Sequence, residues 1–337
     1  MLAQLRFPVE ASRGRRYPER EHAYRTVFQR DRDRIIHTRA FRRLENKTQV
    51  FAPGISDHFR NRLTHTIEVS QIARTVASVL GLNEDLTEAL ALVHDIGHPP
   101  FAHAGEEALN RQMKRFGEGF DHNIQALRIV ESLEQRYPRF PGLNLTFEVR
   151  EGIVKHSRDF AAGEHPELDE YLPGLRPPLE AQLIDLADEV AYNAADLDDA
   201  YEAGLLTPGQ IASAVPVYAD FLDTIETQFP GATDRERFQE SIRYLIDDQV
   251  SGFIEGTVEA VKAARVQDVE AVRRHPSRLA RFTPEVRETS LQLKRFLLAN
   301  VYASDALEQD RHESISRLDR MFEYLLEHPE KMHTADG

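Results

Sequence analysis

The segment from Leu92 to His103 constrains this chain more than any other stretch. It reads Leu-Val-His-Asp-Ile-Gly-His-Pro-Pro-Phe-Ala-His, so three histidines and one aspartate fall within ten residues. His94 and Asp95 stand at the end of an apolar helical pattern, and such groups near a core must be paired, hydrogen-bonded or bound to a metal. A glycine and a Pro-Pro pair then break the backbone. The segment predicts a metal site at a helix end, with further ligands supplied from elsewhere.

Apolar residues recur at helical spacing along most of the chain, and no run shows the period of two that marks a strand. The spacing predicts helices at 64–80, 84–95, 103–116, 122–133, 147–156, 179–199, 208–228, 234–265, 283–302 and 315–326, with a weaker helix within 21–44 and a loop at 161–178. We expect Gly81 to end the first strong helix and Asn83 to cap the next. The prediction is an all-α fold with one domain over 1–337: a core at about 62–200, an N-terminal basic arm at 1–61 and a C-terminal helical extension at 201–337.

The composition excludes several classes of protein and site. The chain contains no cysteine, which excludes disulfides, thiolate catalysis and Cys-ligated zinc or iron–sulfur centres. A metal must therefore be held by nitrogen and oxygen ligands. No apolar run approaches the roughly 18 residues that span a bilayer, and the first residues lack the apolar core of a signal peptide. We expect a cytoplasmic protein with no membrane association.

The net charge of −14 is distributed unevenly. Residues 1–62 carry 15 Lys and Arg against 7 Asp and Glu, whereas the rest of the chain carries 27 against 49. The basic part has two interpretations. It is a solvated arm or an ion-paired oligomer interface, or it forms a positively charged surface that faces a polyanion. The acidic body argues against a general nucleic-acid binder, because non-specific affinity depends on neutralising phosphates. A small phosphorylated ligand fits better.

Further ligands for the metal can be placed from helix geometry. His65 lies on the helix before His94, and the short connection at Gly81–Asn83 brings the two antiparallel helices together. The helix at 179–199 carries Asp188, Tyr192 and Asp196 at i, i+4 and i+8, which form one polar stripe among Leu, Ile, Val and Ala. Most such stripes are solvated faces, but these apolar neighbours favour a site.

The resulting candidate ligands are His65, His94, Asp95 and Asp188. Two imidazoles and two carboxylates without a thiolate suit a hard or borderline divalent ion: Mn²⁺, Mg²⁺, Fe²⁺, Co²⁺, Ni²⁺ or Zn²⁺. Such an ion acidifies water and neutralises phosphoryl charge, so the ligand set indicates a hydrolase.

These four residues match the ligand signature of HD-domain metal phosphohydrolases. Longer segments resemble one branch of that family, the deoxynucleoside triphosphate triphosphohydrolases (bacterial dGTPase-like proteins and their mammalian relative): 24–37, 41–44, 47–51, 62–65, 94–103 and 187–192. The resemblance runs from about residue 10 to about residue 200 and implies an HD-domain helical bundle. Family members usually continue into a further helical segment with an Asp-Tyr-Ile-Ala-Gly-Met-Thr-Asp-like motif, which this sequence lacks, so a truncated chain is consistent with the resemblance.

The resemblance also implies an activity and partners. It implies hydrolysis of dGTP, or of dNTPs broadly, between the 5′ oxygen and the α-phosphorus, releasing deoxynucleoside and intact tripolyphosphate. It further implies a homo-oligomer, a tetramer or hexamer, with a dNTP as a candidate allosteric activator. Single-stranded DNA is the most weakly supported partner.

Four residues around the Pro-Pro turn match catalytic positions of the family. The 5′-alkoxide leaving group needs a proton, and His103 resembles the acid that supplies it. Glu106, three residues later on the same helical face, is expected to hold that imidazole in its useful tautomer. His98 and His122 resemble histidines that contact phosphate. Any one of them alone would more often be a structural residue.

Five further residues match substrate-binding positions. Arg62 resembles a phosphate-binding arginine, and the structural alternative is a surface arginine at the start of a helix. Tyr192 and Asp196 match residues that meet the sugar, where the ring excludes a 2′-hydroxyl and the carboxylate accepts from the 3′-OH. Gln49 and Val50 fall where the family contacts the deoxyribose, and a core or turn role for Gln49 is equally consistent with the sequence.

Two other functions compete with a dNTP triphosphohydrolase. Another HD-domain hydrolase, such as a 5′-nucleotidase or a cyclic-nucleotide phosphodiesterase, would need neither the basic N-terminal block nor the combination of Arg62, His65 and Gln49. A nucleotide-sensing or nucleic-acid-binding protein with a vestigial site would not need the complete ligand set or the His103 and Glu106 pair.

Overall fold

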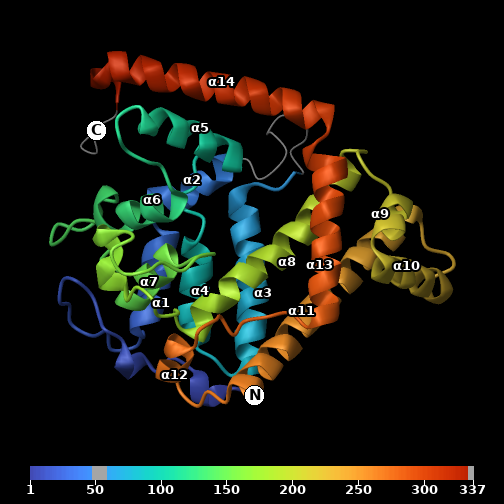
Figure 1. Ribbon diagram of the computed structural model, residues 1–337, viewed down its shortest axis with the longest axis horizontal. Coiled ribbons are helices and arrows are strands. Elements are labelled where there is room, and N and C mark those ends of the chain that lie inside the picture. Colours follow the sequence, from blue (N-terminus) through green and yellow to red (C-terminus); the bar gives the residue numbers. More distant parts are fainter. Residues whose placement is uncertain (48–58, 333–337) are drawn as a thin grey trace.

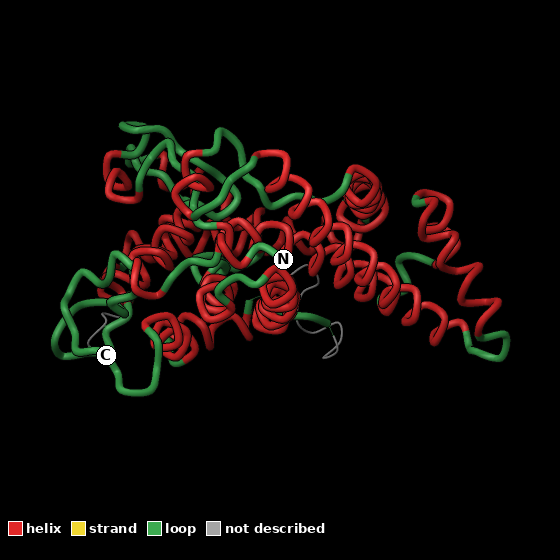
Figure 2. The backbone as a smooth tube through the Cα atoms, turned by 90° about the horizontal axis from the view of Figure 1, so that it is seen from below, coloured by secondary structure: helices red, strands yellow, loops and turns green. Residues whose placement is uncertain are grey.

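The structure is a computed structural model that describes residues 1–47 and 59–332. Within these ranges the regular elements are helices and helical turns, and the only extended pairing is an isolated bridge between Arg15 and Thr146. Figures 1 and 2 show this all-helical architecture from two directions. The predicted all-α class is confirmed. In the described ranges no helix is both long and apolar enough to cross a membrane.

The α-helices have the following bounds: α1 Val27–Ile36, α2 Arg39–Arg43, α3 Arg62–Leu80, α4 Glu84–Val93, α5 Ala102–Lys114, α6 His122–Arg128, α7 Phe147–Val154, α8 Leu179–Glu202, α9 Pro208–Ala214, α10 Pro216–Gln228, α11 Asp234–Ala264, α12 Val269–Arg274, α13 Pro284–Leu297 and α14 Asp305–Glu327. A π-helical turn, Leu298–Tyr302, prolongs α13.

Local capping signals place the helices that carry the site. The side chain of Asn61 accepts from the N–H of Thr64 at the start of α3, and Gly81 ends α3 with a left-handed φ of 79°. Asn83 caps α4 by accepting from the N–H of Leu86. A side-chain acceptor at a helix start satisfies an otherwise free N–H, and glycine takes positive φ without steric cost. The antiparallel α3 and α4 are therefore joined as the sequence predicts.

The structure differs from the predicted elements at four places. The helix expected at 208–228 breaks at Val215, whose extended backbone follows from the proline after it. The expected loop at 161–178 contains the 3₁₀ helix Pro166–Tyr171, and the six-residue α12 was not predicted. The final helix begins ten residues earlier than expected, at Asp305.

The main core is packed around α3, α4 and α8, which lie side by side (Figure 1). Val69, Ala73 and Val76 of α3 are fully buried in it. Ile67 and Val79 of the same helix are 54% and 42% exposed, because they lie on sides of α3 that face away from this core. This core holds the helix faces that carry His65 and Asp188 against each other.

A second cluster of buried apolar side chains joins the end of α8 to α9, α10, α11 and α13. The long α14 lies across α5 (Figure 1), where Arg111 of α5 and Arg115, the residue that follows α5, pair with Asp319 and Glu323 of α14. The division into a core at 62–200, an arm and an extension remains a proposal.

Much of the basic N-terminal part is neutralised within the chain. Arg34, which is buried, pairs with Glu19 at 2.7 Å, and Arg15 pairs with the buried Asp31 at 2.5 Å. Arg30 also lies 3.3 Å from Glu19. The guanidinium groups of Arg15 and Arg34 also donate to the carbonyl of Asn144, at 2.5 Å and 3.1 Å, and so tie this segment to the body of the molecule. Engaged in this way, these arginines are not free to face a polyanion.

Candidate metal centre and active site

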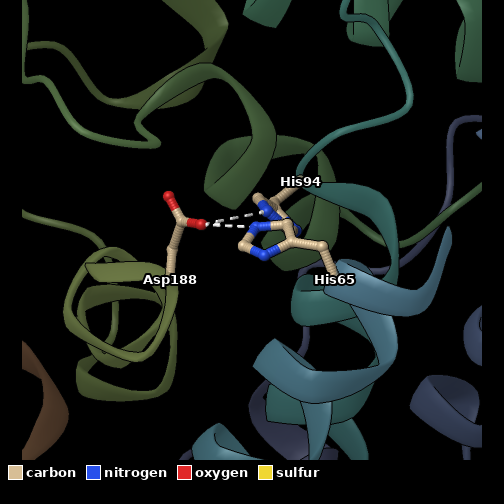
Figure 3. Close-up of side chains that lie close together, drawn as sticks. All are labelled: His65, His94 and Asp188. Carbon is tan, nitrogen blue, oxygen red and sulfur yellow. Dashed lines mark hydrogen bonds and ion pairs between the residues drawn. The ribbon is translucent and has the colours of Figure 1, made fainter. Parts of the chain in front are cut away.

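Three side chains from three helices lie close together where α3, α4 and α8 meet (Figure 3). His65 comes from α3, His94 from the end of α4 and Asp188 from α8, and all their ligand atoms lie within 4.8 Å of one another. Nε2 of His65 is 2.8 Å from Oδ1 of Asp188, and Nε2 of His94 is 3.9 Å from the same oxygen. The short α3–α4 connection and the stripe on α8 thus bring together three of the four predicted ligands.

The hydrogen bonds of His94 fix its tautomer. Its Nδ1–H donates to the carbonyl of Ala91 at 2.6 Å, so the buried Nε2 carries a lone pair. This Nε2 has no hydrogen-bond partner among the described residues, yet carboxylate oxygens of Asp95 and Asp188 lie 3.4 Å and 3.9 Å away. A buried lone pair facing two anionic oxygens is unfavourable unless a cation lies among them. The donor set therefore fits a divalent ion.

The interaction with His65 holds the carboxylate of Asp188 in the ionised form. Burial alone would raise the pKa of Asp188, but the hydrogen bond from His65 lowers it below its usual value. Burial would likewise lower the pKa of His65, and the same bond raises it. The two residues form an ion pair that a bound cation would replace.

Asp95 is fully inside the protein and lies next to this group rather than within it. Oδ2 accepts from NH1 of Arg62 at 2.5 Å, and Oδ1 lies 3.1 Å from Nε2 of His98. Burial favours the protonated carboxyl, but the Arg62 guanidinium holds the pKa of Asp95 well below its ordinary range. The structure thus places Arg62 on Asp95, whereas the sequence led us to expect it on a substrate phosphate.

A second group consists of His98, Glu106 and His122, whose ligand atoms also lie within 4.8 Å of one another. The rings of His98 and His122 are stacked with centroids 4.0 Å apart. Both the backbone N–H of His122 and its Nδ1–H donate to Glu106, at 3.0 Å and 2.9 Å. Burial opposes ionisation of Glu106, but the bonds from His122 lower its pKa to about 2.

In this structure Glu106 is hydrogen-bonded to His122, and its expected support of His103 stays a prediction. Nδ1 of His103 is 4.0 Å from Glu106 and its side chain is 84% exposed. The N–H of His122 is one of the free donors at the start of α6, and a carboxylate is favoured at such a position. Glu106 therefore orients His122, while His103 stands at the open side of the turn.

The other expected substrate residues lie farther along α8. Asp196 is buried and accepts a hydrogen bond from the phenol of Tyr302, and burial raises the pKa of Asp196 to about 7. Tyr192 lies one turn from Asp188, with the ammonium of Lys294 5.5 Å from its ring centroid. Gln49 and Val50 lie outside the described residues.

Sequence reasoning missed several residues around the site. Nζ of Lys47 donates to the carbonyl of Ile96 at 3.2 Å, and burial lowers the pKa of Lys47 to about 8. The ring of His156 lies 5.2 Å from that of His94, and its Nδ1 is 2.8 Å from Asp185. Asp185 lies one turn before Asp188 on α8, and this spacing could have indicated it.

Comparison with known proteins identifies the family. Residues 62–193 match the HD domain, and residues 280–335 match the phosphohydrolase-associated domain. The chain is 46% identical over 321 residues to a deoxyguanosinetriphosphate triphosphohydrolase-like protein of Geobacter sulfurreducens, an alignment that covers 94% of this chain and 82% of the relative. It is 48% identical over 329 residues to a protein of the same name from Ralstonia nicotianae, covering 97% and 84%. The chain belongs to the family of deoxyguanosinetriphosphate triphosphohydrolase-like HD-domain phosphohydrolases.

Proposed function

We propose that this protein hydrolyses deoxynucleoside triphosphates, dGTP or dNTPs broadly, to deoxynucleoside and tripolyphosphate in a reaction that depends on a divalent metal. The observation that carries the proposal is the group of His65, His94 and Asp188, in which both histidines are buried and the free Nε2 of His94 faces two carboxylates. The printed names of the relatives supply the substrate class.

The proposed ligands of the metal are His65, His94, Asp95 and Asp188. When bound, the ion would supply Lewis acidity that activates water and offsets phosphoryl charge. The ligand set suits Mn²⁺, Mg²⁺, Fe²⁺, Co²⁺, Ni²⁺ and Zn²⁺. Arg62 supports this site because its guanidinium keeps Asp95 ionised. In the proposed complex, the remaining N–H groups of Arg62 also face the phosphates.

Proton transfer to the departing 5′ oxygen is assigned to His103. Its imidazole is exposed, so a substrate bound at the metal centre can reach it. His98 and His122 are proposed to contact the phosphates. Glu106 accepts a hydrogen bond from Nδ1–H of His122. This bond fixes the orientation of the ring and leaves Nε2 of His122 to contact a phosphate in the proposed complex. The same bond makes His122 the alternative proton donor, and comparing His103 and His122 variants separates the two.

The sugar is proposed to lie along α8. The ring of Tyr192 would pack against C2′ and exclude a 2′-hydroxyl, and Asp196 would accept from the 3′-OH. The phenol of Tyr302 already occupies one oxygen of Asp196, which leaves the other for the sugar. Gln49 and Val50 complete the proposed sugar contacts. We further propose a homo-oligomer, with a dNTP as activator and single-stranded DNA as a partner to be examined.

The experiment that tests the proposal incubates the protein with each dNTP, singly and mixed, in the presence of each candidate metal after removal of bound ions. Products are separated by ion-exchange and reversed-phase chromatography. Deoxynucleoside with intact tripolyphosphate is expected. Release of orthophosphate or pyrophosphate would place the cleaved bond elsewhere, and hydrolysis of a 5′-monophosphate or a cyclic nucleotide alone would assign the chain to another HD-hydrolase activity. No turnover with any of these would support a sensing role.

A further inference from the structure

His156 lies against the metal centre but belongs to none of the expected site residues. It follows the end of α7, is buried, and meets the ring of His94 edge to face, with centroids 5.2 Å apart and planes inclined by 70°. His94 can present Nε2 to a cation only while its ring stays in the present plane. The hydrogen bond to Ala91 fixes one edge of that ring, and His156 packs against the ring itself.

The orientation of His156 is fixed in turn by Asp185. Nδ1–H of His156 donates to Oδ1 of Asp185 at 2.8 Å, and the N–H of Ser157 donates to the same oxygen at 2.9 Å. Ser157 adopts a left-handed φ of 57°, which is uncommon for a residue other than glycine and costs conformational energy. Asp185 lies one turn before the proposed ligand Asp188, so α8 places both carboxylates on adjoining turns of one helix.

Arg278, between α12 and α13, connects Asp185 to the segment that carries His156. Its guanidinium donates to Asp185 and to the carbonyls of Lys155 and Arg158, the latter two at 2.5 Å and 2.7 Å. It also lies 3.3 Å from Asp159. One planar fork thereby binds the end of α7 to α8, which a lysine could not reproduce with a single ammonium.

We propose that Arg278, Asp185 and His156 form a positioning chain that holds the ring of His94 in its metal-binding orientation. Through this chain a residue of the C-terminal part sets the affinity of the metal centre in the core. The inference rests on the proposed metal site. Outer residues that orient metal ligands typically change metal affinity by about 10- to 100-fold when they are replaced.

The test measures metal binding directly. Wild-type protein and the variants Arg278→Gln, Asp185→Asn and His156→Asn are freed of metal. Their Co²⁺ dissociation constants are measured by equilibrium dialysis, with visible spectra of the loaded proteins. Each variant is expected to bind Co²⁺ about 10- to 100-fold more weakly, with a changed d–d absorption band. Arg274→Gln is the matched control, because Arg274 lies in the same region but its side chain is 73% exposed and it pairs only with Glu270 among the described residues.

Thermal unfolding of the metal-free proteins separates positioning from a general loss of structure. Should Arg278→Gln fail to fold, Asp185→Asn decides. It keeps the volume of the side chain but has one acceptor oxygen in place of two, so it cannot accept from His156 and from Arg278 on separate oxygens. Unchanged Co²⁺ affinity and spectrum in a folded variant would overturn this inference alone. A wild-type protein that binds no Co²⁺, Mn²⁺ or Mg²⁺ would overturn the metal site and the positioning chain together.

Discussion

Arg62 and Asp95 form a buried ion pair in which NH1 lies 2.5 Å from Oδ2. Both side chains are 5% exposed, so removing either partner leaves the other charge in a medium that solvates it poorly. The pair joins the start of α3 to the residue that follows His94. Arg62 is thus part of the support of the proposed metal centre before any phosphate is bound.

Arg62→Met is expected to reduce the free energy of unfolding of the metal-free protein by about 3–5 kcal/mol, because it leaves Asp95 buried without its counter-charge. Urea unfolding measures this change. Arg74→Met is the control on the same helix: Arg74 is 47% exposed, and its loss should cost less than about 1 kcal/mol. An equal decrease in the free energy of unfolding for the two variants would show that the buried Arg62–Asp95 pair stabilises the protein no more than a surface arginine does.

Metal binding and proton transfer should be separable by mutation. Asp188→Ala is expected to lose bound metal, whereas His103→Ala should retain metal and lose about 10²- to 10⁴-fold in kcat, the usual contribution of a general acid. Metal content by atomic absorption and steady-state kinetics give the two readouts, with the half-exposed His165→Ala as control. Normal turnover by His103→Ala, with a large loss in His122→Ala, would transfer the acid role to His122.

Glu106 should be coupled more strongly to His122 than to His103. In a double-mutant cycle on kcat/KM, Glu106→Gln with His122→Ala is expected to be non-additive by about 0.5–3 kcal/mol, as for residues in contact. Glu106→Gln with His103→Ala should show a smaller interaction energy, since Glu106 is hydrogen-bonded to His122 at 2.9 Å and lies 4.0 Å from Nδ1 of His103. The reverse pattern would restore the pairing expected from the sequence.

Asp196 should make stability depend on pH. Burial raises its folded-state pKa to about 7, above the ordinary 3.8, so the folded protein holds this proton more tightly than the unfolded chain. Its contribution to stability is fully present below about pH 4 and is lost as the pH rises through about 7, with an upper bound of about 4 kcal/mol. Asp196→Asn should flatten this part of the stability profile, measured by urea unfolding from pH 5 to 8. The exposed Asp220→Asn should leave it unchanged, and an unaltered slope in Asp196→Asn would contradict the assignment.

Features with local causes could be predicted from the sequence. Gly81 and Asn83 end one helix and begin the next, and this connection alone places His65 near His94. The i, i+4, i+8 spacing of the polar stripe on α8 added Asp188. The break at Val215 escaped prediction although its cause, the following proline, is also local.

Partners that depend on helix packing could not be predicted in the same way. Glu106 lies three residues from His103 but bonds to His122, 16 residues away, because α6 begins beside α5. Arg278 and Asp185 are 93 residues apart, and no periodicity links them. The ion pairs of the basic N-terminal part also depend on the fold. The sequence shows an excess of arginine there, but it does not show which carboxylates pair with these arginines.

The position of bond cleavage is the central claim, and hydrolysis in H₂¹⁸O tests it most directly. The protein is loaded with its activating metal and given the best dNTP substrate, and the products are analysed by mass spectrometry. Attack of water on the α-phosphorus predicts one ¹⁸O in tripolyphosphate and none in the deoxynucleoside. Label in the deoxynucleoside, or in released orthophosphate or pyrophosphate, would contradict the account.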